Sequence, residues 1–370
     1  MKQSFIPGVA TALVTPFLGK EINYPMAEQL IRQQIDAGIG AIVLSGTTGE
    51  SPVLTDGEKL ELFRRGKAYA GKNCRILAGT GSNSTEHTIA LSAAAQETGV
   101  DGLLIVSPYY NKSTPDGLVG HYTAIARQVE LPIILYNVPS RTGLDIPVSV
   151  YEKLSRIPNI IGVKEASTDI TKITRIRNAC GEDFEIYTGN DTMVVPAMAC
   201  GARGVVSVVS NVCPQTTQAM VQSTLSGDFG TAAAIQCALQ ELIDLLFREV
   251  NPIPVKAAMA LSGFDCGQCR LPLGAPSMET GKNYRNFSAG KAGNSLYKAG
   301  KIPRLQTAVG FFTSVVCPPG RGTRSPRPHI PADYPQARRR QVSSPSPPGG
   351  AGGGKYTWRW PPLPYPGWWP

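Results

Sequence analysis

Residues 102–137, GLLIVSPYYNKSTPDGLVGHYTAIARQVELPIILYN, decide the fold. An apolar run, GLLIVS, opens this stretch, and a second apolar run, PIILYN, closes it. Both runs are continuous rather than alternating, as in strands that are buried on both faces of a parallel sheet. The chain between them is long enough for one crossover helix. The stretch therefore predicts a strand, a helix and a second, parallel strand.

The same pattern extends in both directions along the chain. Eight apolar runs are separated by segments with apolar residues three and four positions apart, which is typical of amphipathic helices. Eight such units favour an α/β fold of the (β/α)8 (TIM) barrel type over an open doubly wound sheet. The predicted strands are Val9–Thr15, Ala41–Ser45, Arg75–Gly79, Gly102–Ser107, Pro132–Asn137, Ile160–Lys164, Glu185–Thr188 and Gly204–Val209. The clearest predicted helices are Glu58–Ala70, Thr85–Glu97, Val148–Ser155 and Thr192–Ala199.

Composition divides the chain at residue 278. Residues 1–277 hold 22 Lys and Arg against 25 Asp and Glu, whereas residues 278–370 hold 14 against 2, together with all four Trp. The net charge of +9 therefore belongs to the tail and gives no reason to expect a nucleic-acid partner for the rest. We expect a catalytic barrel over 1–224, a C-terminal helical appendage over 225–277, and a disordered Pro/Gly/Arg/Trp-rich tail over 278–370 that is a frameshift product or another non-native extension. The alternative for the tail is a Pro-rich ligand segment or a basic nucleic-acid arm.

The sequence argues against several classes of protein. Its longest apolar runs are about half the roughly 20 residues that span a bilayer. The first residues lack the apolar core of a secretory signal, so we expect a cytoplasmic location and no membrane partner. The irregular spacing of eight Cys does not suggest a disulfide framework. Cys266 and Cys269 have zinc-like spacing without a second pair, so we expect no metal, and the absence of nucleotide-binding motifs predicts no cofactor.

Lys164 closes the apolar run IIGV, and it is the strongest candidate for a reactive group. At the end of a barrel strand its amine would be poorly solvated, which lowers the pKa of a lysine. A neutral amine attacks ketones, and the resulting protonated imine withdraws electrons from the neighbouring carbon. The alternatives are a lysine whose amine reaches the solvent at the strand end, or one that is paired with Glu165.

Other candidates lie at neighbouring strand ends. Tyr136 could transfer protons next to Lys164, or it could be a core tyrosine. Thr47 and Thr48 lie in a Gly-flanked turn that could bind a carboxylate, although such turns also occur without any function. Arg141 follows Pro139, where its guanidinium could bind a second carboxylate, or it could be an ordinary surface charge.

Seven motifs together resemble the dihydrodipicolinate synthase family of class I pyruvate-dependent aldolases, which is related to N-acetylneuraminate lyase. They cover residues 1 to about 277: GTTGES (46–51), SPYYNK (107–112), YNVPSRTG (136–143), GVKEAS (162–167), TGND (188–191), GVVSVVSN (204–211) and NPIPVKAA (251–258). The resemblance implies a lyase that condenses pyruvate with L-aspartate 4-semialdehyde through a Schiff base, in lysine and diaminopimelate biosynthesis. It also implies a (β/α)8 barrel that assembles as a homotetramer, a dimer of dimers.

The resemblance also assigns catalytic roles. Lys164 matches the Schiff-base lysine, and Tyr136 matches the tyrosine that transfers its protons. Thr47 matches the threonine that links this tyrosine to a second one, here Tyr110, which is contributed across a dimer interface.

Substrate-binding roles follow in the same way. Thr48 matches a contact to the pyruvate carboxylate, and Arg141 matches the group that binds the semialdehyde carboxylate. Gly189 and Val206 match positions close to bound pyruvate. The alternative functions are another pyruvate-dependent class I aldolase, such as N-acetylneuraminate lyase or 2-keto-3-deoxygluconate aldolase, and an inactive scaffold. Arg141 favours a short substrate with a carboxylate over a polyol chain.

Two departures from the family carry further expectations. Family members continue after Pro276 with a final amphipathic helix, which the sequence from Met278 onward does not suggest, so apolar surface should be left exposed on the appendage. In addition, His87 stands where lysine-sensitive members carry an acidic residue. The sequence therefore predicts weak inhibition by lysine.

Overall fold

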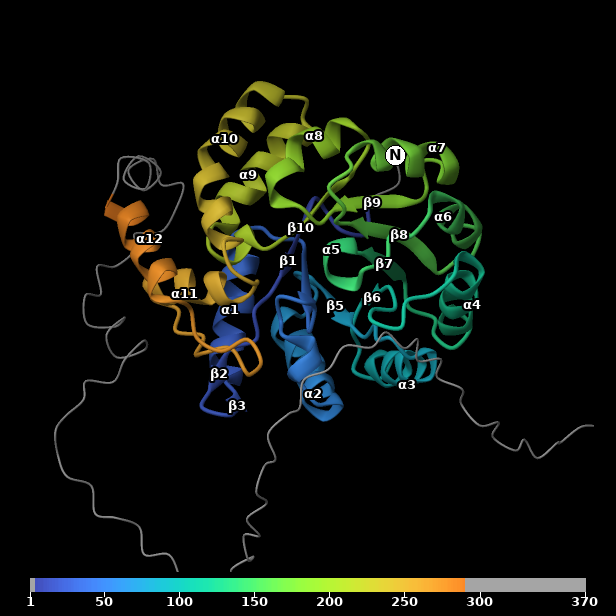
Figure 1. Cartoon of the computed structure of the whole chain (residues 1–370), viewed down its shortest axis with the longest axis horizontal. Coiled ribbons are helices and arrows are strands. Elements are labelled where there is room, and N and C mark those ends of the chain that lie inside the picture. The colour runs from blue at the N-terminus through green and yellow to red at the C-terminus, as the bar shows by residue number, and fades with distance from the viewer. Residues whose placement is uncertain (1–3, 290–370) are drawn as a thin grey trace, which may run out of the picture. The chain divides into compact units, whose positions relative to one another are not determined.

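Eight parallel strands close into a barrel in the computed structural model, which describes residues 4–289 (Figure 1). Each strand pairs with the next in chain order, and the first pairs with the last, so the sheet closes on itself. The predicted (β/α)8 barrel is confirmed. Its strands are β1 (Val9–Ala12), β4 (Ala41–Leu44), β5 (Arg75–Gly79), β6 (Gly102–Val106), β7 (Ile133–Asn137), β8 (Ile160–Glu165), β9 (Glu185–Thr188) and β10 (Gly204–Ser207).

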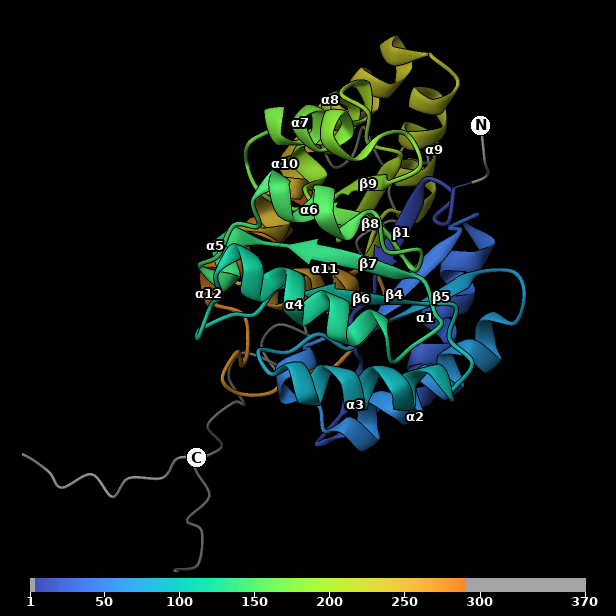
Figure 2. The same ribbon diagram turned by 90° about the vertical axis from the view of Figure 1, so that its right-hand side faces the viewer.

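Helices surround the barrel and cover the outer face of its sheet (Figures 1 and 2). The four clearest predicted helices are present, with ends within two residues of the expectation. The helices of the ring are α1 (Tyr24–Asp36), α2 (Asp56–Ala70), α3 (Thr85–Gln96), α4 (Pro115–Ala126), α6 (Val148–Leu154), α7 (Thr171–Cys180), α8 (Val194–Ala199) and α9 (Pro214–Leu225). Two small elements were not predicted from the sequence: the hairpin of β2 (Phe17–Leu18) with β3 (Glu21–Ile22), and the one-turn helix α5 (Pro139–Thr142).

Side-chain caps begin the first four ring helices. Asn23, Thr55, Ser84 and Thr114 each accept a hydrogen bond from a backbone N–H of the first turn. At α2 the cap is reciprocal, because the carboxylate of Glu58 also accepts from the Thr55 N–H at 2.8 Å. Such caps satisfy backbone donors that the helix itself leaves free, and they fix where each loop after a strand must end.

Two apolar layers hold the barrel together. Alternate strand residues point inward, and these include Ala10, Leu77, Ile134 and Val206. The remaining strand residues point outward and pack against the helices in a larger cluster. Full burial of each large aliphatic side chain stabilises the fold by about 1.5–3 kcal/mol.

The helical appendage consists of α10 (Phe229–Leu246) and α11 (Ile253–Leu261). The expected boundary at residue 224 falls at the C-terminal end of α9, against which α10 packs. By length and composition α10 could span a membrane, and it is the one described helix that passes this test. Its buried residues, which include Ile235, Leu239 and Ile243, face the neighbouring helices, as expected for a core helix of a globular protein.

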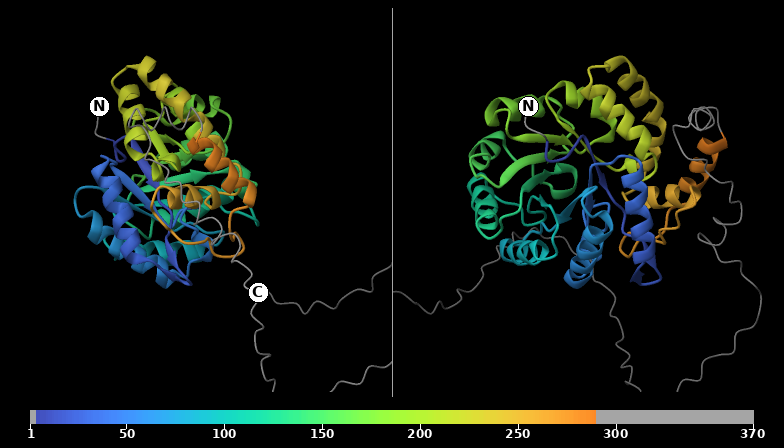
Figure 3. Two further views of the ribbon diagram at one scale, coloured as in Figure 1. Left: turned by 90° about the vertical axis from the view of Figure 1, so that its left-hand side faces the viewer. Right: turned by 180° about the vertical axis from the view of Figure 1, so that it is seen from behind.

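The predicted start of the tail, residue 278, is too early in the sequence. Residues 278–289 form a further helix, α12, which lies beside α10 and α11 at the edge of the molecule (Figure 3). Tyr284 is fully buried, and Glu249 accepts hydrogen bonds from Ser277 and Thr280 at the start of the helix. The final helix that the sequence did not suggest is therefore present, because one buried aromatic and one polar anchor suffice to dock it. The remaining tail, residues 290–370, lies outside the described residues.

We expect α12 to be needed for stability. A chain that ends at Ser277 should unfold at a lower temperature than one that ends at Ala289, because it loses the burial of Tyr284, which is worth about 2–3 kcal/mol. Tyr284→Ala should reproduce most of the loss, and substitution of the exposed Lys282 by Ala should not. Thermal unfolding measures all four proteins. Equal unfolding temperatures for the two truncated chains would contradict the assignment.

Candidate active site

Lys164 lies on β8 with its side chain inside the barrel. The residue is only 6% exposed, although it carries an amine. Its register partners are Tyr136 on β7 and Tyr187 on β9, so aromatic residues flank it on both neighbouring strands. The amine nitrogen lies 4.2 Å from the centre of the Tyr136 ring, a distance at which a cation is attracted to the face of the ring.

The sequence left open whether Lys164 is paired with Glu165, and the structure shows that it is not. Adjacent strand residues point to opposite faces, so Glu165 leaves the barrel on the side of the helices. Its carboxylate accepts hydrogen bonds from Asn137 at 2.9 and 3.0 Å and lies 3.5 Å from the amine of Lys172 on α7. Lys172 also pairs with Asp145. Within residues 4–289, Lys164 has no carboxylate within ion-pair distance.

Gly189 provides the space for the Lys164 side chain. A Cβ atom at this position would lie 2.9 Å from Cε of Lys164 and 2.7 Å from Cβ of Ala166, closer than real Cβ contacts. Only glycine fits next to this lysine without a shift of its neighbours. Gly189 therefore lies directly beside Lys164, and its expected place next to bound pyruvate stays a prediction.

Asp191, two residues later, is fully buried. Its carboxylate accepts hydrogen bonds from the backbone N–H groups of Val208 and Val209 at 2.8 and 3.2 Å, which fixes the chain after β10. Burial raises the pKa of Asp191, and the nearby positive charge of Lys164 opposes this rise. The sequence motif TGND contained this residue, but its role as an anchor for the next loop was not foreseen.

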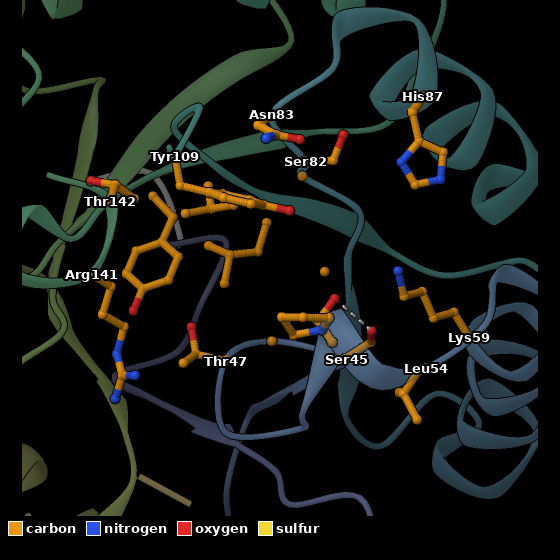
Figure 4. Close-up of a pocket in the computed structure, with 18 of the residues that line it drawn as sticks. Ser45, Thr47, Leu54, Lys59, Ser82, Asn83, His87, Tyr109, Arg141 and Thr142 are labelled. Atoms are coloured by element: carbon orange, nitrogen blue, oxygen red, sulfur yellow. Dashed lines mark hydrogen bonds between the residues drawn. The ribbon is translucent and has the colours of Figure 1, made fainter. Parts of the chain in front are cut away.

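A cavity of about 630 Å³ opens at the carboxyl ends of β4 to β7. Three of the predicted site residues line it: Tyr136, Thr47 and Arg141. Thr47 and Arg141 lie on one side of the cavity, and Lys59 and His87 lie on the other (Figure 4). Lys164 does not line the cavity itself, but its amine lies 4.2 Å from the centre of the ring of Tyr136, which does.

The other predicted residues lie around this site rather than on the wall of the cavity. Thr48 is buried, and its hydroxyl accepts a hydrogen bond from the side chain of Asn251 at 2.9 Å. Val206 belongs to the apolar cluster inside the barrel that also contains Tyr136. Tyr110 is 91% exposed and adopts a positive φ of 67°, so its phenol does not reach the cavity of its own chain.

The outer side of the cavity carries a small charged cluster. Asp56 accepts a hydrogen bond from His87 at 2.8 Å and lies 3.6 Å from the amine of Lys59. These two contacts, that with His87 foremost, lower the pKa of Asp56. The carboxylate is therefore already engaged by two partners within the chain. Weak inhibition by lysine stays a prediction.

The arrangement suits amine catalysis. Three or more potential metal ligands do not gather at any point within residues 4–289. A phenol, a hydroxyl and a guanidinium instead line one opening, and a buried amine lies against the ring of the phenol. Together they can form a covalent imine, transfer its protons and hold a carboxylate. Two sets of contacts could not be predicted from the sequence: the polar cluster around Glu165 and the hydrogen bond from Asn251 to Thr48. Each joins segments that are distant in the sequence or lie on different elements.

Comparison with known proteins gives a consistent result. The model of the "Dihydrodipicolinate synthetase family" matches residues 6–287. The 4-hydroxy-tetrahydrodipicolinate synthase of Acetivibrio thermocellus is 43% identical over 273 residues, which is 74% of this chain and 93% of that protein.

Solved structures agree with this result. The dihydrodipicolinate synthase of Bacillus anthracis is 40% identical, with a TM-score of 0.74 over 76% of this chain and 97% of that one. The enzyme of Cyanidioschyzon merolae, solved with lysine bound, is also 40% identical, with a TM-score of 0.75 over 80% of this chain and 99% of that one.

The two neighbouring buried lysines should respond differently to the same substitution. Lys172→Met removes the partner of Glu165 and Asp145, and an uncompensated buried charge costs about 3–5 kcal/mol. Lys164→Met removes an amine without a carboxylate partner and should change the free energy of unfolding by about 1 kcal/mol or less. Chemical unfolding of both variants measures the difference. A larger loss for Lys164→Met than for Lys172→Met would show that the pairing is the reverse of that described.

Proposed function

The chain belongs to the dihydrodipicolinate synthetase family, and we propose that Lys164 is its Schiff-base nucleophile. Tyr136, Thr47 and Tyr110 would take part in proton transfer, and Arg141 would bind substrate. The activity is that of a 4-hydroxy-tetrahydrodipicolinate synthase, a lyase of lysine and diaminopimelate biosynthesis. Its substrates are pyruvate and L-aspartate 4-semialdehyde. The observation that carries the assignment of the nucleophile is a buried amine that lies 4.2 Å from the Tyr136 ring and lacks a carboxylate partner among the described residues.

The first half of the reaction uses the amine. Neutral Lys164 attacks the ketone carbon of pyruvate, a C–N bond forms, and water leaves as the imine is completed. Tyr136, whose ring centre lies 4.2 Å from the amine, would move the protons of these steps, and Thr47 shares the cavity with Tyr136. Loss of a methyl proton then gives an enamine, because the protonated imine accepts the electron pair.

The second half joins the two substrates. The enamine carbon attacks the aldehyde carbon of the semialdehyde, and the aldehyde oxygen becomes a hydroxyl. The amino group of the semialdehyde then attacks the imine carbon, closes the ring and releases Lys164. One water is lost overall, and the lysine is regenerated.

Carboxylate binding explains the remaining polar groups. Thr48 and the turn around it would hold the pyruvate carboxylate, and Gly189 and Val206 would form the wall next to the bound pyruvate. Arg141, which lines the cavity, would bind the carboxylate of the semialdehyde. A sugar-acid aldolase, the alternative raised by the sequence, would need groups for a polyol chain at this place.

The proposal also includes the assembly of the chain into an oligomer and its location in the cell. Tyr110 is almost fully exposed, and in the proposed homotetramer, a dimer of dimers, it would enter the site of a second copy and reach Thr47 there. A cytoplasmic location fits a biosynthetic enzyme in which α10, the one helix of spanning length among residues 4–289, packs against neighbouring helices.

Reductive trapping tests the nucleophile. Pyruvate with borohydride should add one reduced adduct per chain, at Lys164, and peptide mapping should locate it there. Lys164→Arg should abolish the adduct, because a guanidinium is not nucleophilic at neutral pH. Lys67→Arg, at the opposite end of the barrel, is the matched control and should keep it. An adduct on Lys256, the other lysine of a motif, would show that the nucleophile is misassigned.

Arg141→Ala tests the second substrate. The variant should lose about 1.5–3 kcal/mol of binding to the semialdehyde carboxylate, since a charge-assisted contact is removed. This corresponds to roughly a ten- to hundredfold fall in kcat/KM for aspartate semialdehyde. The rate of pyruvate adduct formation should change little. A parallel loss of adduct formation would mean that Arg141 supports the lysine site instead.

A further inference from the structure

The turn of residues 45–51, between β4 and α2, carries Thr47 and Thr48. Two of its non-glycine residues, Ser45 and Glu50, adopt positive φ angles of 53° and 59°. Such conformations cost free energy in L-residues and persist only where the surroundings hold them. Inside the turn, the Glu50 N–H donates to the carbonyl of Thr47 at 3.1 Å, and the Ser51 N–H donates to that of Gly46 at 3.3 Å. The stronger restraints on the turn are contacts with other segments of the chain.

The side chain of Glu50 reaches away from the cavity into the appendage. Its carboxylate has no exposed surface, and Oε1 lies 2.6 Å from Nζ of Lys256 on α11. Oε2 accepts a hydrogen bond from the backbone N–H of Arg270 at 2.9 Å. One carboxylate therefore joins the turn to two segments near the C-terminal end of the described chain.

Lys256 is held as firmly as its partner. It is 4% exposed, and its amine lies 4.2 Å from the centre of the Phe17 ring, over which the guanidinium of Arg270 also lies, at 4.4 Å. Desolvation of two charges is costly, so removal of either one leaves a buried ion without its counter-charge. The amine of Lys256 is thus engaged by the carboxylate of Glu50.

The same part of the appendage makes a second contact with the turn. Asn251, just before α11, donates a hydrogen bond from its amide to the hydroxyl of Thr48 at 2.9 Å. Asn251 and Lys256 both belong to the motif NPIPVK, which the catalytic assignment leaves unused. The appendage thus contacts the turn at Glu50 and at the residue that would bind the pyruvate carboxylate.

We propose that Glu50 and Lys256 are positioning residues for the reaction: their buried ion pair anchors the turn to α11 and so holds Thr47 and Thr48 at the substrate. This inference rests on the proposed function. Neither side chain contacts substrate, and both act through the two threonines. The helical appendage is then part of the active-site framework and not only a cover for the barrel.

The experiment compares Glu50→Gln, Lys256→Met and the double variant that carries both changes, in the full chain. Lys67→Met is the matched control, because Lys67 forms a partly buried ion pair of 2.6 Å with Asp101 at the amino ends of the strands. Circular dichroism and thermal unfolding report the folded fraction. On folded protein, kcat, KM for pyruvate and the rate of borohydride trapping report the position of the turn.

We expect the double variant to fold, since it leaves no unpaired charge, and to raise KM for pyruvate about tenfold or more with a similar fall in kcat and in trapping rate. A misplacement of about 1 Å can cost roughly a hundredfold in rate. Lys67→Met should lower the unfolding temperature and keep kcat and KM within about twofold of the unaltered chain, because it removes the same kind of contact away from the turn.

Two results would overturn the proposal: folded variants whose KM, kcat and trapping rate match the unaltered chain, or failure of all three variants to fold, which would make the pair a purely structural feature. A different result would contradict the proposed function. In that case the unaltered chain itself would form no adduct with pyruvate.

Discussion

The alternation of side chains along β8 is the constraint on which the site depends. Lys164 and Glu165 are adjacent in the sequence, and two opposite charges so close would normally pair. The pleat of the strand sends the first into the barrel and the second toward the helices, where Lys172 and Asn137 bind it. The amine is thereby left inside the barrel, over the ring of Tyr136. A shift of this strand by one residue would exchange the two charges and abolish the site.

Closure of the barrel determines where this amine can react. Ile6 plugs the amino end, where its N–H donates to the phenol of Tyr187 at 2.9 Å, and buried inward residues fill the middle. The carboxyl ends of the strands remain the open side, and the loops that follow them bring polar groups to one opening. Tyr136, Thr47 and Arg141 come from three different loops or strands but face the same cavity. Their convergence follows from the parallel direction of the strands.

Much of this could be predicted from the sequence, because it depends on local pattern. Continuous apolar runs identified all eight strands, and a lysine or tyrosine at the end of such a run identified Lys164 and Tyr136. Contacts between distant segments could not be predicted, since no local signal relates Glu50 to Lys256. The helix α12 was missed for a related reason: its weak amphipathic pattern stands at the border of a tail of very different composition, and the burial of Tyr284 is visible only against α10 and α11. The proposed contact of Tyr110 with the Thr47 of a second copy depends on assembly, and it has no counterpart within a single chain.

Lys164 and Lys256 show how one residue type takes opposite roles at the same end of a barrel. Both are about 95% buried, and both lie next to an aromatic ring at 4.2 Å. Only Lys256 has a carboxylate at 2.6 Å, and the resulting ion pair can anchor a turn. Lys164 has no carboxylate within ion-pair distance among residues 4–289, which is why we propose it, and not Lys256, as the nucleophile. The proposed anchor and the proposed nucleophile therefore differ in the position of a single carboxylate, because burial and aromatic contact are common to both lysines.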